Sequence, residues 1–160
     1  MSIDVELVIE DERWSDLIDP ESLVSAICEK LSIRCRVEIA NSFEASILFC
    51  SDERMRELNR FWMKKDYPTN VLSFPSAQHP HSSYLGDIAI AFETIVAEAK
   101  AEGKAPLNHT AHMVVHGFLH LLGYDHQTDD EATRMEGLET LLLQDLGIPD
   151  PWARERGEEI

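Results

Sequence analysis

Hydrophobic and polar residues alternate in some segments of this chain, and hydrophobic residues recur every three to four positions in others. The first pattern predicts β-strands, and the second predicts helices that bury one face. Segments with the strand pattern lie at 5–9, 36–39, 45–49, 70–74 and 85–92. The helix pattern follows Asp19 as far as Leu31, follows Ser51 as far as Trp62, and occupies 93–102, 107–122 and 129–146.

The residues at the ends of the predicted helices support these boundaries. Asp19 and Ser51 have side-chain oxygens that can cap a helix N-terminus. Gly103, Gly123 and Gly147 follow three of the helices, and glycine readily adopts the left-handed conformation that ends a helix. Strands and helices in mixed order predict an α+β fold, with a single mixed β-sheet of four to five strands packed with about five helices.

The composition is that of a folded domain. Hydrophobic residues make up 44% of the 160 residues, which is too many for a disordered chain. We expect one domain over 1–160, with a core at about 5–148 and an acidic tail at 149–160. No apolar run is long enough to span a membrane, and the N-terminus lacks the basic region of a signal peptide. The three scattered cysteines lack a CxxC pair, so we expect buried thiols in a cytoplasmic protein.

The charge is strongly negative but unevenly distributed. The chain has 30 Asp and Glu against 14 Lys and Arg, a net charge of −16. This balance disfavours a general nucleic-acid binder, because affinity for polyanions depends on Lys and Arg. Five of the basic residues nevertheless fall within 54–65, among them Arg60, Lys64 and Lys65. The segment is either a local site for a polyanion or the solvated face of a helix.

Five of the seven histidines lie between residues 109 and 126. His116 and His120 are four residues apart, which on a helix places both imidazoles on one face, about 6 Å from each other. His126 is six residues further on, and Gly123 allows the chain to turn back and bring it to the same point. His116, His120 and His126 therefore predict a site in which three nitrogens bind one metal ion.

Three protein ligands leave a fourth tetrahedral position for water, as in catalytic zinc sites. A bound divalent ion lowers the pKa of that water to about 7 and so yields hydroxide for hydrolysis. Imidazole ligands favour one Zn²⁺ ion per chain, although they also suit nickel, copper and iron. Asp125 is a candidate to hold a ligand histidine by its second ring nitrogen or to contact the water.

The histidine segment leaves one alternative open. His112, His116 and His120 form one stripe on the predicted helix, so His112 can pair with His116 instead. His126 would then have no role, which favours the first set. The remaining histidines, interpreted as loop or surface residues, are His79, His81 and His109.

The spacing of the three histidines also occurs in metzincin proteases, where a glutamate after the first histidine is the general base. Gly117 stands at that position in this chain. Because glycine cannot take a proton, a peptidase of that kind is disfavoured. Metal-assisted hydrolysis by another route remains open.

The segment 116–126, HGFLHLLGYDH, resembles the signature of the YbeY family of bacterial metal-dependent, single-strand endoribonucleases. Segments 65–75 and 85–90 resemble the family as well, and the resemblance covers about 5–148. It implies zinc bound by the three histidines named above and an α+β fold with a metalloprotease-like metal-site helix. It also implies a role in small-subunit rRNA maturation and ribosome quality control, with single-stranded RNA and the ribosome or ribosomal proteins as partners.

One position departs from the family pattern. The family usually has an arginine two residues before Lys65, and this chain has Met63 there. Arg60 and Lys64 are candidates to supply the missing charge, and together with Asp125 they are the candidate catalytic residues besides the activated water. Arg60, Lys64 and Lys65 are the candidates for substrate binding.

The resemblance therefore favours a metal-dependent endoribonuclease acting in rRNA processing. One alternative is a metal-dependent hydrolase of another substrate. Another is a non-catalytic, zinc-containing ribosome-associated factor. This alternative remains because Met63 replaces the arginine that the family usually has. Trp62 and Tyr67 either stack on unpaired bases or pack in the core, and core packing is the expectation. Asp87 either orients a group of the site or caps a turn.

Overall fold

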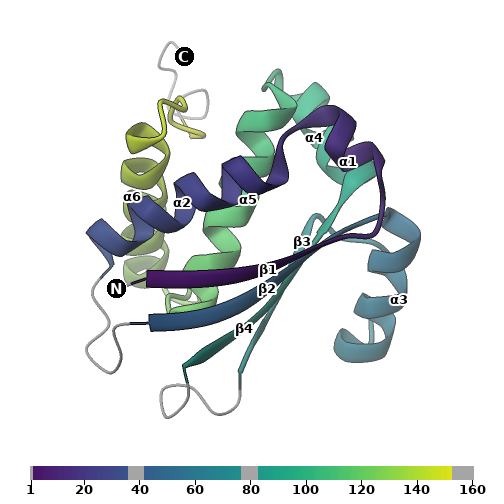
Figure 1. Ribbon diagram of the computed structural model, residues 1–160, viewed down its shortest axis with the longest axis horizontal. Helices are drawn as coiled ribbons and strands as arrows, with labels where there is room; N and C mark the ends of the chain where they lie inside the picture. The colour runs from purple at the N-terminus through teal and green to yellow at the C-terminus, as the bar shows by residue number, and fades with distance from the viewer. Residues whose placement is uncertain (1, 36–41, 77–82, 153–160) are drawn as a thin grey trace.

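The computed structural model describes residues 2–35, 42–76 and 83–152, and these form four strands and six helices. The strands are β1 (Ser2–Ile9), β2 (Ser42–Cys50), β3 (Val71–Pro75) and β4 (Tyr84–Ala91). The helices are α1 (Arg13–Leu17), α2 (Pro20–Arg34), α3 (Asp52–Met63), α4 (Phe92–Glu102), α5 (Pro106–Leu121) and α6 (Asp129–Asp145). This arrangement confirms the predicted α+β class (Figure 1).

The strands form one mixed sheet with the order β1-β2-β4-β3. β1 pairs with β2 and β2 with β4 in parallel, whereas β3 pairs antiparallel with β4. β3 is therefore an edge strand, with β4 as its neighbour on one side. Pro75 at its end fits this position, because proline cannot donate a hydrogen bond to a further strand.

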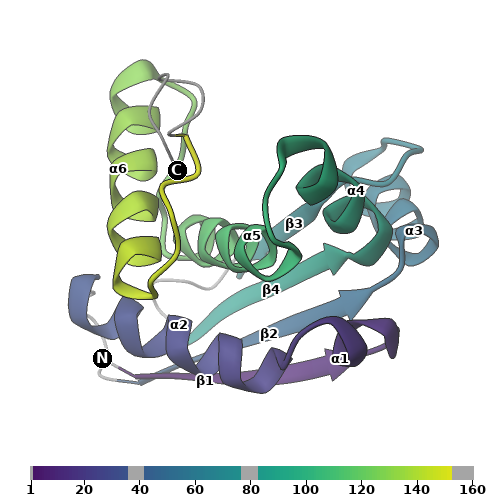
Figure 2. The same cartoon turned by 90° about the horizontal axis from the view of Figure 1, so that it is seen from above.

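The two faces of the sheet pack against different helices. Residues that alternate along β2, such as Ile47 and Phe49, belong to the large core shared with α2, α5 and α6. The next residue along the strand, Cys50, instead packs with Met55 of α3 in a smaller cluster. Figures 1 and 2 show α5 lying over the sheet with α6 to one side of it, and α3 at one end of the sheet. The alternation of side chains along the strands thus places α5 and α3 on opposite faces.

The predicted elements agree with the structure over most of the described chain. The strands predicted at 5–9, 45–49, 70–74 and 85–92 are present with small shifts of their ends. The five predicted helices are present as α2 to α6. The strand predicted at 36–39 lies outside the described residues. The sequence analysis missed α1, a five-residue helix too short to show a periodic pattern.

The N-terminal part of the chain is anchored by one tryptophan. Trp14 of α1 is fully buried, and its Nε1–H donates to the carbonyl of Cys50 at 3.0 Å. Its ring packs edge-on against Phe49 and Phe92, with ring centroids 5.3 Å apart in both cases. Cys28, Cys35 and Cys50 are all buried with free thiols, as expected. Within the described ranges, no helix is long and apolar enough to cross a bilayer.

Candidate metal centre

Helix α5 presents two of the predicted ligands at its C-terminal end. The helix is buried over most of its length, whereas His116 and His120 are each half-buried. They lie one helical turn apart on the side that faces a cavity of about 580 Å³. Val71 and Ser73 of the edge strand β3 line the same cavity. The strand edge and the histidines thus share one open space.

The turn after α5 brings the third histidine to this cavity. Gly123 has φ +100°, in the region that favours glycine. Its N–H donates to the carbonyl of His120 at 3.1 Å, and the N–H of Tyr124 donates to the carbonyl of Leu119 at 2.9 Å. These two bonds form the Schellman pattern that ends a helix. The left-handed turn predicted at Gly123 is present, and His126 lies on the cavity wall.

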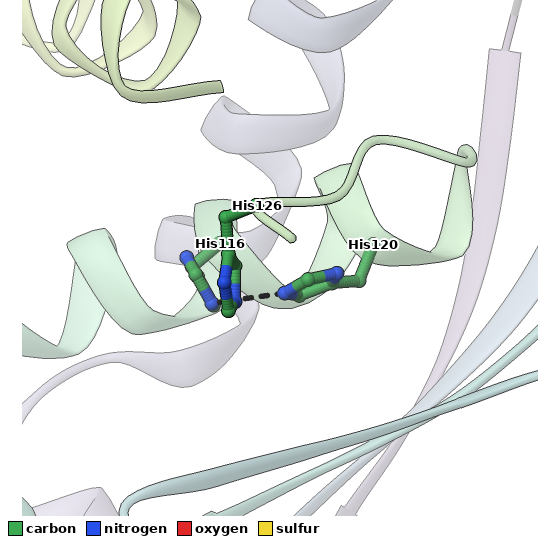
Figure 3. Close-up of side chains that lie close together, drawn as sticks. All are labelled: His116, His120 and His126. Carbon is green, nitrogen blue, oxygen red and sulfur yellow. Dashed lines mark hydrogen bonds between the residues drawn. The ribbon is translucent and has the colours of Figure 1, made fainter. Parts of the chain in front are cut away.

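The three imidazoles converge (Figure 3). The Nε2 atoms of His116 and His120 are 3.1 Å apart, and one nitrogen from each of His116, His120 and His126 lies within 4.8 Å of the others. Nitrogens bound to tetrahedral zinc at about 2.0–2.1 Å are about 3.3 Å from one another. The observed separations therefore fit a shared metal ion after small side-chain shifts.

The second ring nitrogen of His120 has its own partner. Nδ1 of His120 lies 3.1 Å from the carbonyl oxygen of Tyr124, so it donates its hydrogen there and Nε2 faces His116. Burial lowers the pKa of His120, and the neighbouring His116 and His126 lower it further. Both effects favour the neutral ring, which is the form that binds metals.

The second ring nitrogen of His116 is held by a residue that the sequence analysis missed. Oε1 of Glu139, on α6, lies 2.7 Å from Nδ1 of His116. Oε2 of the same carboxylate lies 2.6 Å from Nε2 of His112. Glu139 is 1% exposed. Burial raises its pKa, but the hydrogen bonds from His112 and His116 outweigh burial, and the net pKa lies below the ordinary value.

The structure bears on two expectations about neighbouring residues; of the two roles open to Asp125, contact with the activated water stays a prediction. Asp125 does not hold a ligand ring: its Oδ1 accepts the backbone N–H of His126 at 2.8 Å, and Glu139 and the Tyr124 carbonyl hold the rings instead. Asp125 still lines the cavity. The alternative that pairs His112 with His116 is also wrong, because Glu139 lies between their ring nitrogens.

The interpretation of His109 as a loop or surface residue is wrong as well. α5 begins at Pro106, so His109 lies in its first turn and is buried against α4. Its Nε2 lies 2.8 Å from a carboxylate oxygen of Glu98. His79 and His81 lie outside the described residues.

Gly117 faces the sheet rather than the cavity. A Cβ at this position would lie 3.1 Å from two side-chain carbons of Ile88 on β4. The hydroxyl of Ser73 donates to the Gly117 carbonyl at 3.3 Å and joins the edge strand to the helix. The position of the metzincin general base therefore has no room here for a longer side chain.

The basic residues of α3 lie apart from the cavity of the histidines. Arg60, Lys64 and Lys65 are exposed, and none of them is among the described residues that line that cavity. They lie at the end of α3 and just after it, and α3 packs on the opposite face of the sheet from α5. Of the two interpretations of segment 54–65, a polyanion site that borders the cavity of the histidines is therefore not what the structure shows for these three residues.

The aromatic residues of this region are exposed, so the expectation of core packing is wrong. Trp62 is 61% exposed and Tyr67 is 52% exposed. The Trp62 ring stands edge-on to Phe61, with centroids 4.9 Å apart, and lies 6.2 Å from Phe74 of β3. Met63, in place of the family arginine, is exposed beside them.

Asp87 lies on β4 and is exposed. Its carboxylate accepts a hydrogen bond from the hydroxyl of Tyr84. Because Ile88 and Ile90 belong to the core beneath α5, the alternation of side chains places Asp87 on the opposite face. Asp87 therefore neither orients a histidine nor caps a turn.

The fold and the three converging imidazoles define a class of small α+β proteins with a histidine site on a buried helix beside an edge strand. The sequence then identifies the family. The family described as Endoribonuclease YbeY matches residues 8–147, and the chain belongs to this family.

Similar proteins support this assignment. Endoribonuclease YbeY from Azorhizobium caulinodans and from Bartonella bacilliformis are each 45% identical to this chain, over 154 and 158 residues, covering 94% of the chain and 97% of each relative. Endoribonuclease YbeY from Methylocella silvestris is 42% identical and covers 92% of the chain and 85% of the relative. The solution structure of TM1509 from Thermotoga maritima has the same fold, with a TM-score of 0.64 at 21% identity over 96% of this chain and 93% of that one.

Proposed function

We propose that this protein is a metal-dependent endoribonuclease that cleaves single-stranded RNA during maturation of small-subunit rRNA and in ribosome quality control. His116, His120 and His126 hold one divalent ion, with zinc favoured and nickel possible for this ligand set. The bound ion supplies Lewis-acid polarisation and an activated water for hydrolysis. Membership of the YbeY endoribonuclease family supports RNA as the substrate.

One observation carries the proposal. The Nδ1 atoms of His116 and His120 each face an acceptor, the Glu139 carboxylate and the Tyr124 carbonyl. In neutral rings the Nε2 atoms then have lone pairs, and these lone pairs face each other across 3.1 Å. Two lone pairs at this distance repel unless a cation lies between them. The surrounding protein thus prepares the two rings for a metal.

The cavity determines what the chain itself can do for an RNA substrate. Its described lining residues include no Lys or Arg, so the negative phosphate of a substrate has its main attraction in the metal. The edge of β3 lines the cavity and offers backbone groups for hydrogen bonds. Because Arg60, Lys64 and Lys65 lie outside this cavity, any contact they make with the substrate is with nucleotides further along the RNA.

A cleavage assay on end-labelled single-stranded RNA tests this function. We expect metal-dependent internal cleavage by the wild type, little cleavage of a duplex of the same sequence, and loss of cleavage in His116→Ala and after chelation. His109→Gln is the matched control, since it changes a histidine of the same helix outside the site and retains a donor for Glu98. Cleavage that survives both chelation and His116→Ala would contradict the metal mechanism.

The same assay separates the alternatives. An inactive protein that binds ribosomes only when loaded with zinc would indicate a non-catalytic ribosome-associated factor. The exposed Met63 favours testing this alternative, because it stands where the family usually has an arginine. Cleavage of peptides or esters in place of RNA would indicate another hydrolase. The orientation of Gly117 toward Ile88 argues against the peptidase.

A further inference from the structure

A buried carboxylate joins two histidines of α5 to α6. Glu139 accepts from His112 with one oxygen and from His116 with the other, so both of its oxygens are used inside the protein. Of the two histidines, His116 alone belongs to the converging group. The carboxylate therefore lies one ring away from the predicted metal position.

The environment of His112 fixes where its hydrogen lies. Nδ1 of His112 is buried and has no hydrogen-bond partner within the described part of the chain. A hydrogen on this nitrogen would be buried without an acceptor, which is unfavourable. The hydrogen of the neutral ring therefore lies on Nε2 and points at Glu139. The ring is confined by Trp152, whose centroid lies 5.1 Å away.

We propose that Glu139 is a positioning residue for the metal site: it holds the hydrogen of His116 on Nδ1 and so keeps the Nε2 lone pair directed at His120 and His126. The inference rests on the proposed function only in taking His116 as a metal ligand. Carboxylates that accept from the second nitrogen of a ligand histidine fix its tautomer and its orientation. His112 occupies the second oxygen and fixes the carboxylate in turn.

The two hydrogen bonds make a sharp prediction for Glu139→Gln. An amide has one oxygen that accepts and one NH₂ group that donates, so it cannot accept from both rings. Because His112 presents a hydrogen, the amide oxygen must face His112. The NH₂ group then faces Nδ1 of His116, which must become an acceptor, and the hydrogen of His116 moves to Nε2. This isosteric substitution thus blocks the nitrogen that faces the metal.

Replacing His112 should reverse this effect. In His112→Phe combined with Glu139→Gln, no donor holds the amide oxygen, so the amide can turn and accept from Nδ1 of His116. The metal-facing lone pair of His116 is then restored. A purely structural role for Glu139 predicts the opposite, since two buried substitutions would harm the site more than one.

Zinc affinity at fixed pH, measured with a competing chromophoric chelator and without RNA, tests the inference. We expect about 10–100-fold weaker binding in Glu139→Gln, recovery of most of that loss in the double variant, and a smaller loss in His112→Phe, in which the carboxylate still accepts from His116. The matched control is Glu53→Gln, the same change at an exposed position of α3, which should bind zinc as the wild type does. Histidine ¹⁵N spectra of the zinc-free proteins should show the His116 hydrogen on Nδ1 in the wild type and on Nε2 in Glu139→Gln.

Equal zinc affinity in the wild type and Glu139→Gln would overturn the inference. A double variant that binds no better than Glu139→Gln would also overturn it. Because the assay contains no RNA, these results are distinct from a failure of the proposed function. Absence of RNA cleavage alongside the expected zinc pattern would reject the nuclease and leave the role of Glu139 standing.

Discussion

Replacement of Gly123 by valine tests how the third histidine reaches the site. Gly123 has φ +100°, and a Cβ added there would meet no heavy atom within 4 Å. The cost of the change is therefore backbone strain alone. For an L-residue in the left-handed region this strain is about 1–2 kcal/mol, and a β-branched residue lies at the upper end of that range or above it.

This strain has a direct consequence for metal affinity. Gly123 lies between the helical pair and His126, so the variant relieves its strain by releasing the turn that positions His126. Metal binding must then restore the strained turn. At 1.4 kcal/mol for each factor of ten, about 1–2 kcal/mol corresponds to about 5–30-fold weaker zinc binding. We expect Gly123→Asn to lose less, because asparagine tolerates positive φ.

The chain offers a matched control for this variant. Gly147 ends α6 with φ +75° and likewise has no heavy atom within 4 Å of an added Cβ. Gly147→Val therefore imposes similar strain away from the histidines. Thermal unfolding should show that both valine variants are destabilised, whereas the zinc titration should show weaker binding in Gly123→Val only. Equal zinc affinity in all three proteins would refute the role of the turn.

The remaining predictions concern the core, a helix cap and the basic residues. Gly117→Glu should destabilise the protein by several kcal/mol, because it buries a carboxylate against Ile88, and it should yield no peptidase activity; a well-folded, active peptidase would contradict the geometry. Hydrogen bonds from the Ser22 hydroxyl and N–H lower the pKa of Asp19. Its contribution to stability is therefore present above the unfolded-state pKa of about 3.8 and is lost as pH falls through the lower folded-state value. Asp19→Ala should lower the urea midpoint at pH 7 and lower it progressively less as pH falls below 3.8, and an equal loss at every pH would refute this assignment. Arg60→Ala with Lys64→Ala should weaken single-stranded RNA binding and lower the magnitude of the salt slope by about 1.4, at about 0.7 for each of the two charges, and an unchanged slope would place both side chains away from the RNA.

The sequence predicted the convergence of the three histidines because that geometry is local. A helical pair, a glycine that ends the helix and a third histidine lie within eleven residues, and each part follows from backbone preferences near it. The left-handed Gly123 and the convergence of His116, His120 and His126 agree with that reasoning.

Glu139 was missed because its contacts are not local. It lies 23 residues from His116 and 27 from His112, and the contact depends on how α6 packs on α5. A signal was nevertheless present: Glu139 lies on the same face of α6 as the buried residues Met135 and Leu142. A carboxylate on an apolar stripe requires a partner, and the buried histidine stripe of α5 provides one.

The exposed aromatic residues show that helical periodicity alone does not predict which side chains are buried. Met55, near the start of the helix predicted from Ser51 to Trp62, is buried, whereas Trp62 at its end is exposed. α3 packs on β4, and Trp62 reaches only the edge strand, where its ring lies 6.2 Å from that of Phe74. Periodicity gives the direction of a side chain on its helix. It does not say how far the sheet extends beneath that helix.

The electrostatics of the metal centre resolve an apparent conflict in the proposed function. A protein with a net charge of −16 repels RNA at long range, yet phosphate must reach the histidines. Three neutral imidazoles leave the full charge of a bound dication in place, and the buried Glu139 offsets only part of it. A divalent ion bound as proposed would therefore give the cavity a local positive centre, although its described lining includes no Lys or Arg. It follows that removing the metal should abolish phosphate affinity at this site more completely than neutralising any single basic residue on α3.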